Sequence, residues 1–196
     1  MKTLPGARYR VSLPPDGATE RRTLDERLFV RFPALYRLVA MANTRMPVGS
    51  RLRRALIARA LARGMAAANR RDFEVLVIGL DPQIVYHPRP DEPDTSPHVG
   101  RDAYERLVYG FVESFSEVTV EVLEVIDAGD HVIASTVLHA VPRGQGSASA
   151  AGISDTYVLV FKLRHGLVVE GWEYRTKQEA LEAVGLSEQD AHAEPG

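Results

Sequence analysis

The sequence predicts an α+β domain in which helices pack on one face of a strongly curved antiparallel sheet. Two patterns support this fold class. Segments with a helical apolar period occupy much of residues 28–115, and four long runs of alternating polar and apolar residues follow them. Because a sheet with one apolar face must be covered by another layer, we expect the helices to cover one side of it and the curved sheet to have a concave face.

The N-terminal part is predicted to be an irregular segment followed by a helix. Residues 1–22 contain several Pro and Gly breakers, and a helical period then continues from Leu28 to Met46. Pro33 fits best near a helix start or at a kink, because it has no N–H for an interior turn.

Two longer helices are predicted beyond this arm, with a short helical stretch between them. Ser50 is a suitable N-cap for a helix that continues to about Asn69, whose apolar face is mostly small. The short stretch covers residues 71–80. After it, residues 101–115 again place their apolar side chains on one face.

The strand predictions rest on alternation and on turn residues. A short strand, 84–86, ends at His87 and Pro88, and a proline-rich loop continues to residue 100. The four alternating runs are 116–127, 131–142, 153–164 and 167–175. Tight turns separate the first from the second and the third from the fourth, whereas residues 143–152 form a looser connection, so the runs predict an antiparallel meander.

A capping box announces the last helix. Thr176 and Glu179 have the spacing in which each side chain satisfies a free backbone amide, and Gly185 has the place of a C-terminal cap. We therefore divide the chain into a basic arm with one helix (1–50), a folded domain (51–186) and a polar tail (187–196).

Composition excludes several classes of protein. The chain has 196 residues, of which 45% are hydrophobic and 26% charged, as in an ordinary globular domain. It contains no cysteine, which excludes disulfides, zinc ribbons and a thiol nucleophile. No stretch has the length of a membrane span and the N-terminus has no signal-like apolar region, so we expect a cytoplasmic protein without a membrane partner.

The charges are distributed unevenly. Residues 1–71 contain 16 Lys/Arg and 4 Asp/Glu, whereas residues 72–196 contain 8 and 22. A basic segment can bind nucleic acid, but these arginines alternate with alanine and leucine rather than with base-stacking aromatics. We therefore favour an arm held on the acidic part of its own chain or on a dimer mate. The arginines of the disfavoured nucleic-acid alternative are Arg51, Arg53, Arg54, Arg59 and Arg63.

The order of these elements, together with short motifs, resembles the SnoaL-like polyketide cyclase branch of the nuclear-transport-factor-2-like superfamily. The motifs are NRRDF at 69–73, LDPQIVYHP at 80–88, HVGRDA at 98–103 and GLVVEGWEY at 166–174. The resemblance covers about residues 51–186 and has no counterpart for the arm.

This resemblance implies an open cone with a ligand pocket at its mouth and a homodimer formed through the outer sheet face. Relatives include isomerases, dehydratases, epoxide hydrolases, cyclases and members without catalysis, so the fold alone does not decide the function. The expected partner is a small, largely apolar, oxygenated ligand. If the protein is an enzyme, the resemblance implies cofactor-free acid–base chemistry.

His87 is the first candidate base. In the ketosteroid isomerase branch an aspartate base stands before a proline at the end of the first strand, and His87 before Pro88 resembles that place. A histidine titrates near neutral pH and can accept a proton. The structural alternative is a histidine at a loop edge that binds a backbone carbonyl.

His139 and Asp155 form a second candidate pair. Each is a polar residue on a strand and must be paired or functional if its face is buried. If the connection 143–152 closes symmetrically, the two residues lie opposite each other, and Asp155 would orient the imidazole. The same arrangement also describes a structural hydrogen bond, and a shift of one residue would separate the pair.

The remaining candidates would bind the ligand. Tyr86 and Tyr157 can donate to a substrate oxygen, Trp172 can form an aromatic wall, and Glu170 either enters the pocket or faces a dimer interface. The acidic–aromatic pair at 173–174 matches a family motif, which we interpret as mainly structural.

His98 lies at the end of the proline-rich loop, where a lid would be. Together with His87 and His139 it could suggest a metal site, but the spacing matches no ligand motif and the family resemblance implies none. No phosphate-binding or nucleophile-elbow motif is present either. We therefore expect no metal or other cofactor. The alternative to an enzyme is a non-catalytic binding or dimerisation module.

Overall fold

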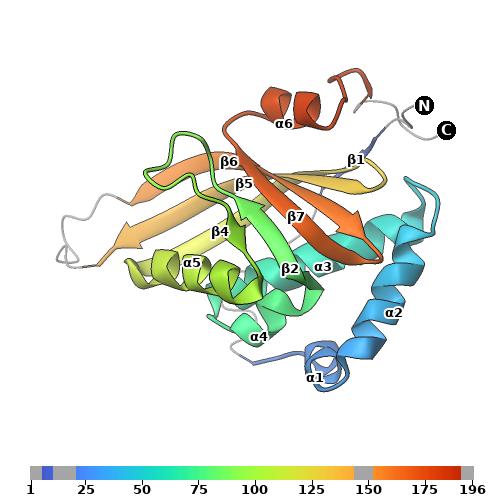
Figure 1. Ribbon diagram of the computed structural model, residues 1–196, viewed down its shortest axis with the longest axis horizontal. Coiled ribbons are helices and arrows are strands. Elements are labelled where there is room, and N and C mark those ends of the chain that lie inside the picture. Colours follow the sequence, from blue (N-terminus) through green and yellow to red (C-terminus); the bar gives the residue numbers. More distant parts are fainter. Residues whose placement is uncertain (1–5, 11–20, 144–151, 191–196) are drawn as a thin grey trace.

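The computed structural model describes residues 6–10, 21–143 and 152–190, and their strands form one curved sheet (Figure 1). The strands are β1 (Ala7–Tyr9), β2 (Leu80–His87), β3 (His98–Val99), β4 (Phe115–Asp127), β5 (His131–Pro142), β6 (Ile153–Arg164) and β7 (Leu167–Tyr174). The helices are α1 (Leu24–Arg31), α2 (Pro33–Thr44), α3 (Arg51–Asn69), α4 (Phe73–Leu76), the 3-10 turn η1 (Val77–Gly79), α5 (Arg101–Glu113) and α6 (Lys177–Ala183). The α+β class is confirmed.

The four alternating runs form the predicted meander. Strands β4, β5, β6 and β7 are antiparallel neighbours, within about one residue of the predicted bounds. The sheet is not wholly antiparallel, however, because β2 pairs in parallel with β7. Strands β2 and β7 are far apart in sequence, so their relative direction is set by the intervening path of the chain rather than by a hairpin.

Helices cover both faces of the sheet. On the concave side, α3 and α5 contribute Ile57, Leu61 and Leu107 to a core with Val132 and Leu159 of the strands. On the convex side, α6 packs in a second core (Figure 1). That core contains Ile126, Ile133, Val158, Val160, Ala180, Leu181 and Leu186. The expectation of helices on one face is therefore correct for α3 and α5 and wrong for α6.

The N-terminal arm differs from its prediction in two ways. Its helical segment is two helices, because Pro33 begins α2 at the N-terminal position where a missing N–H costs nothing. In addition, Ala7–Tyr9, predicted to be irregular, forms edge strand β1 against residues 125–127 of β4. Only the last three residues of β4 are paired in this way. The Pro and Gly residues of the segment 1–22 give no sign of this strand.

The helix caps agree with the sequence. Ser50 Oγ accepts a hydrogen bond from the backbone N–H of Arg53 at the start of α3. Thr176 and Glu179 make both hydrogen bonds of the predicted capping box, and Gly185 has the positive φ of 73° that suits a glycine after a helix.

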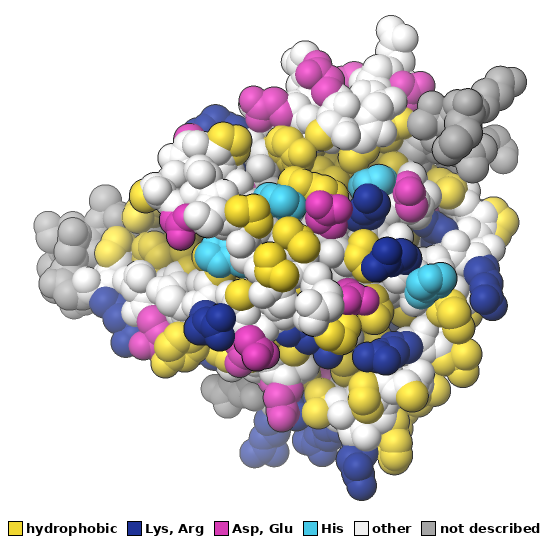
Figure 2. Space-filling view, viewed as in Figure 1, with side chains coloured by type: hydrophobic (Ala, Val, Ile, Leu, Met, Phe, Trp, Pro, Cys, Tyr) yellow, Lys and Arg dark blue, Asp and Glu magenta, His cyan; other side chains and the backbone are white. Residues whose placement is uncertain are grey.

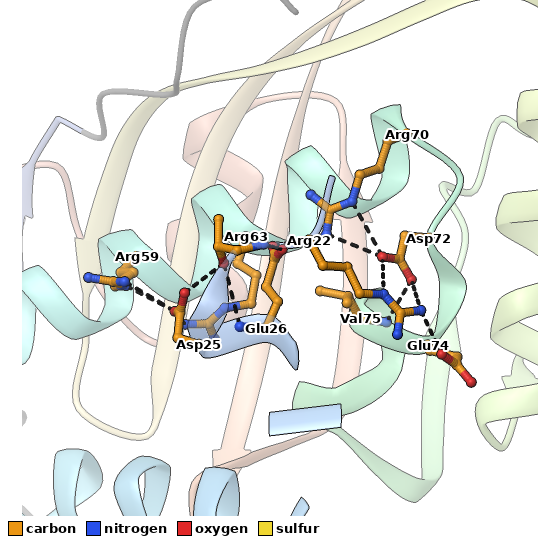
Figure 3. A network of polar contacts seen from close by, with 10 residues as sticks. Arg22, Asp25, Glu26, Arg59, Arg63, Arg70, Asp72, Glu74 and Val75 are labelled. Atoms are coloured by element: carbon orange, nitrogen blue, oxygen red, sulfur yellow. Dashed lines mark hydrogen bonds and ion pairs between the residues drawn. The ribbon is translucent and has the colours of Figure 1, made fainter. Parts of the chain in front are cut away.

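Ion pairs of both polarities attach the arm to the domain, some as expected and some reversed (Figure 3). Acidic residues of α1 bind arginines of α3: Asp25 lies 3.0 Å from Arg63, and Glu26 lies 2.9 Å from Arg70. Two arginines of the arm follow the predicted direction. Arg22 binds Asp72 through Nε and Nη2, each at 2.7 Å, and Arg8 of β1 forms an ion pair with Glu124 of β4.

A fully buried ion pair joins α3 to the end of β4. Arg53 donates to both oxygens of Asp127, at 2.7 and 2.8 Å, and also to the backbone carbonyls of Thr44 and Met46. Arg53 is therefore a structural residue inside the protein, which removes it from the arginines suggested for nucleic-acid contact.

Candidate functional site

The concave face and the helices enclose a cavity of about 530 Å³. Its wall is formed mainly by apolar side chains of α2, α3, α5 and the strands, with a few polar groups. A largely apolar hollow with a few convergent polar groups is the usual form of a small-molecule site.

The centre of the polar part is a contact between two neighbouring strands. Tyr86 of β2 and Glu173 of β7 both point to the concave side, and the Tyr86 hydroxyl donates a hydrogen bond to Glu173 Oε1. Gly171 lies beside Tyr86 in the parallel register, and its missing side chain leaves room for the phenol ring.

The environment shifts the pKa of the Glu173 carboxyl upward. Burial is the main cause, and the negative charges of Glu92 and Asp155 add to it. The hydrogen bond from Tyr86 and the positive charge of Arg89 act in the opposite direction without reversing the shift. The pKa of Glu173 is therefore higher than that of an exposed glutamate.

Two further phenols accompany this pair. The ring of Tyr104, from α5, lies 5.0 Å from that of Tyr86 at an interplanar angle of 68°. Tyr157, from β6, also lines the cavity. Burial, followed by the charge of Glu173, raises the pKa of Tyr157 to about 12, so its hydroxyl remains a proton donor at neutral pH.

Asp155 lines the cavity as alternation predicts, but its partner is Arg89 rather than a histidine. Arg89 Nη1 lies 2.8 Å from Asp155 Oδ2, and Nη2 lies 3.3 Å from Glu92. These residues bring the loop after β2 against β6 and surround Glu173 with charges of both signs.

The predicted pairing of His139 with Asp155 is wrong. The register of β5 and β6 places Leu138 opposite Asp155 and His139 opposite Ser154. This shift of one residue turns His139 to the convex face, where it is exposed. Dimerisation through the convex face stays a prediction.

His87, Trp172 and Glu170 lie together on the convex face, outside the cavity. The imidazole stacks on the indole with ring centroids 5.5 Å apart, and His87 Nε2 lies 3.2 Å from Glu170 Oε1. His87 therefore does not line the cavity. Trp172, expected to form an aromatic wall of the pocket, packs instead against the convex-side core that contains α6. Successive strand residues face opposite sides, so Tyr86 points inward while His87 points outward.

His98 pairs across β3 and β2 with Tyr86 but is not among the residues lining the cavity. Within the described ranges, no three His, Asp or Glu side chains are grouped closely enough to hold a metal ion. The polar residues that line the cavity around the Tyr86–Glu173 contact include Tyr157 and Asp155, which the sequence predicts with Tyr86, and Tyr104 and Arg89, which it does not predict, like Glu173 itself.

Residues 61–171 match the SnoaL-like domain family, and the chain belongs to that family. This confirms the resemblance seen in the sequence motifs. A comparison with curated proteins found no match.

Solved structures with low sequence identity share the fold. Bal32a, from a soil-derived mobile gene cassette, is 23% identical over 63% of this chain and 91% of its own, with a TM-score of 0.53. IdmH of Streptomyces antibioticus, a candidate polyketide cyclase, is 20% identical over 66% and 98%, with a TM-score of 0.52. TerC, co-crystallised with polyporic acid, is 15% identical over 60% and 89%, with a TM-score of 0.50.

Proposed function

We propose that the cavity binds a small, largely apolar, oxygenated molecule and that Glu173 transfers a proton to or from it. The observation that carries the proposal is the Tyr86–Glu173 contact, which places a carboxyl of raised pKa in a mainly apolar hollow. The family and its solved relatives, one with polyporic acid and one a candidate polyketide cyclase, are consistent with a ligand of this class.

The proposed reaction begins with proton abstraction from a carbon next to a ligand carbonyl. The Glu173 carboxylate accepts that proton, and a phenol hydroxyl of Tyr157 or Tyr104 donates to the carbonyl oxygen, where negative charge develops. Return of the proton from Glu173 to another atom of the ligand completes an isomerisation. A base of raised pKa is suited to this step because its affinity for protons is higher than that of an exposed glutamate.

Ligand binding is tested by filling the cavity. Gly64 lies in α3 on the cavity wall, and a Cβ added there meets no atom within 4 Å. Gly64→Phe should abolish binding of terpenoid, steroid and polyketide ketones, measured by native mass spectrometry. The matched control is Gly110→Phe, in α5, where a Cβ is equally unobstructed but the residue does not line the cavity. Equal binding by both variants would contradict the assignment of the cavity.

Proton transfer is tested separately by incubating bound ketones in deuterium oxide. The wild type should catalyse exchange of hydrogen for deuterium next to the carbonyl, and Glu173→Gln should abolish it while retaining ligand binding. Binding without exchange in the wild type would instead identify a non-catalytic binding module.

A further inference from the structure

The outer side of α1 and α2 is an exposed surface of unusual composition. We call it the arm surface; its apolar residues are Leu24, Leu28, Phe32 and Leu38, and its basic residues are Arg27, Arg31, Arg37 and Arg45. Leu24 is 84% exposed, Leu38 59% and Phe32 52%. Figure 2 shows hydrophobic and basic side chains next to one another on the right of the view, where Figure 1 places α2.

The arginines of the arm surface have no counter-charge among the residues that the structure describes. None of its four arginines forms an ion pair with another residue in the described ranges. The two acidic residues of α1 are engaged elsewhere, since Asp25 and Glu26 bind arginines of α3, and α2 contains no acidic residue.

We infer that the arm surface binds the headgroup region of an anionic lipid bilayer. No helix in the described part of the chain is long and apolar enough to cross a membrane, so the contact is at the surface. Exposed leucine and phenylalanine side chains can enter the acyl boundary while the arginines reach lipid phosphates. The inference departs from the sequence-based expectation of no membrane partner, which rested on the lack of a spanning segment.

The same composition disfavours other occupants. A second copy related by a two-fold axis would bring this basic surface against the same basic surface of its partner, and like charges repel. Nucleic acid would neutralise the arginines but would leave the exposed Leu24, Phe32 and Leu38 without apolar contacts. An anionic bilayer offers phosphates to the arginines and an apolar acyl region to the leucine and phenylalanine side chains.

The position of the two helices also connects the arm surface with the cavity. Phe29 of α1 and Tyr36 and Val39 of α2 line the cavity, so these helices separate it from the proposed bilayer. An apolar ligand dissolved in the membrane would then have a short path to the site. This last step rests on the proposed function, whereas vesicle binding does not.

The test is co-sedimentation of the full chain with vesicles of phosphatidylglycerol and phosphatidylcholine in equal parts, compared with pure phosphatidylcholine. We expect binding to the anionic vesicles that weakens at high salt. Arg37→Gln/Arg45→Gln should weaken it about fivefold for each arginine removed. Leu24→Ser/Leu38→Ser should weaken it as well, by loss of apolar burial.

The matched control is Leu123→Ser/Arg164→Gln, which removes one exposed apolar and one exposed basic side chain from the sheet. It should bind like the wild type, and circular dichroism should show that all variants are folded. Equal binding of the wild type to both vesicle types, or unchanged binding of the arm variants, would overturn the inference. Two further outcomes would overturn it. A change of the arm variants from dimer to monomer would assign the surface to a second copy of the chain, and binding of the wild type to DNA but not to vesicles would assign it to nucleic acid.

Discussion

The Tyr86 hydroxyl donates its hydrogen bond to Glu173 across the one parallel strand pair among the described residues. Both groups belong to the concave face and line a cavity whose wall is mainly apolar. The contact therefore combines two features of acid–base sites, a carboxyl of raised pKa and a donor that orients it. It also makes the stability of the protein dependent on the ionisation of Glu173.

We predict that Glu173→Gln removes a pH dependence of stability. Because burial raises the pKa of Glu173 in the folded state above about 4.3, its value in an unfolded chain, the folded state favours the protonated form. The wild type should then lose stability as pH rises from the unfolded towards the folded pKa, whereas Glu173→Gln should not. Urea denaturation across this pH range measures the difference.

Tyr86→Phe provides the companion measurement. It removes the hydrogen bond that lowers the pKa of Glu173, so the loss of stability should extend to higher pH than in the wild type. If the wild type and Glu173→Gln gave parallel stability curves, Glu173 would have an ordinary pKa and the proposed base would lose its support.

Gly171→Ala should disturb the same contact sterically. A Cβ at this position would lie 2.9 Å from Tyr86 Cδ2 and 3.4 Å from Phe161 Cδ1, closer than the ring of Tyr86 can tolerate without moving. We expect a loss of about 1–3 kcal/mol in the free energy of unfolding, as for other overpacked cores. Gly110→Ala, in an unobstructed helical position, should instead gain about 0.5–1 kcal/mol. Similar effects for both variants would contradict the packing at Gly171.

The sequence predicts the elements of this fold well because each depends on local physics. One-sided burial produces the alternation that defines β4 to β7, and Ser50 marks the first turn of α3 through its own hydrogen bond. The position of Asp155 on the concave face follows from the same alternation. Register does not follow, because the loop between β5 and β6 can close in more than one way.

The sequence pattern also predicts Glu170, and not Glu173, as a residue of the pocket, and the reason is again the strand register. The tight turn pairs Arg164 with Leu167 and Leu163 with Val168, and continuing this register would place Trp172 on the concave face. A bulge between Lys162 and Leu163 shifts the pairing by one residue and turns Glu173 inward instead. The acidic–aromatic motif at 173–174 draws attention to Glu173, but alternation without the bulge places its side chain on the convex face.

Asp25 should make the attachment of the arm sensitive to acid. Burial acts to raise its pKa, but hydrogen bonds from Thr23 and Arg63 and the charges of Arg63 and Arg59 outweigh burial and lower the pKa to about 2. A carboxyl whose pKa is lowered by folding contributes stability at neutral pH, which is lost as pH falls from about 4 towards 2.

We therefore expect Asp25→Asn to cost about 1–2 kcal/mol at neutral pH and little at pH 2, where the wild-type carboxyl is itself partly protonated. Thermal unfolding at the two pH values measures the change. A loss of the same size at both would show that packing, rather than charge, accounts for the effect of the substitution.

The buried pair Arg53–Asp127 should be the most sensitive ion pair of the fold. Both side chains are almost fully enclosed, at 2% and 0% exposure, so removing one leaves the other charge without compensation. Asp127→Ala should lower the free energy of unfolding by about 3–5 kcal/mol, measured by urea denaturation. Arg53→Met/Asp127→Leu should lose less than this single variant, because it removes the charge that would be left buried. A loss below about 1 kcal/mol for Asp127→Ala, typical of exposed pairs, would mean that water reaches Arg53 and that the pair does not hold α3 against β4.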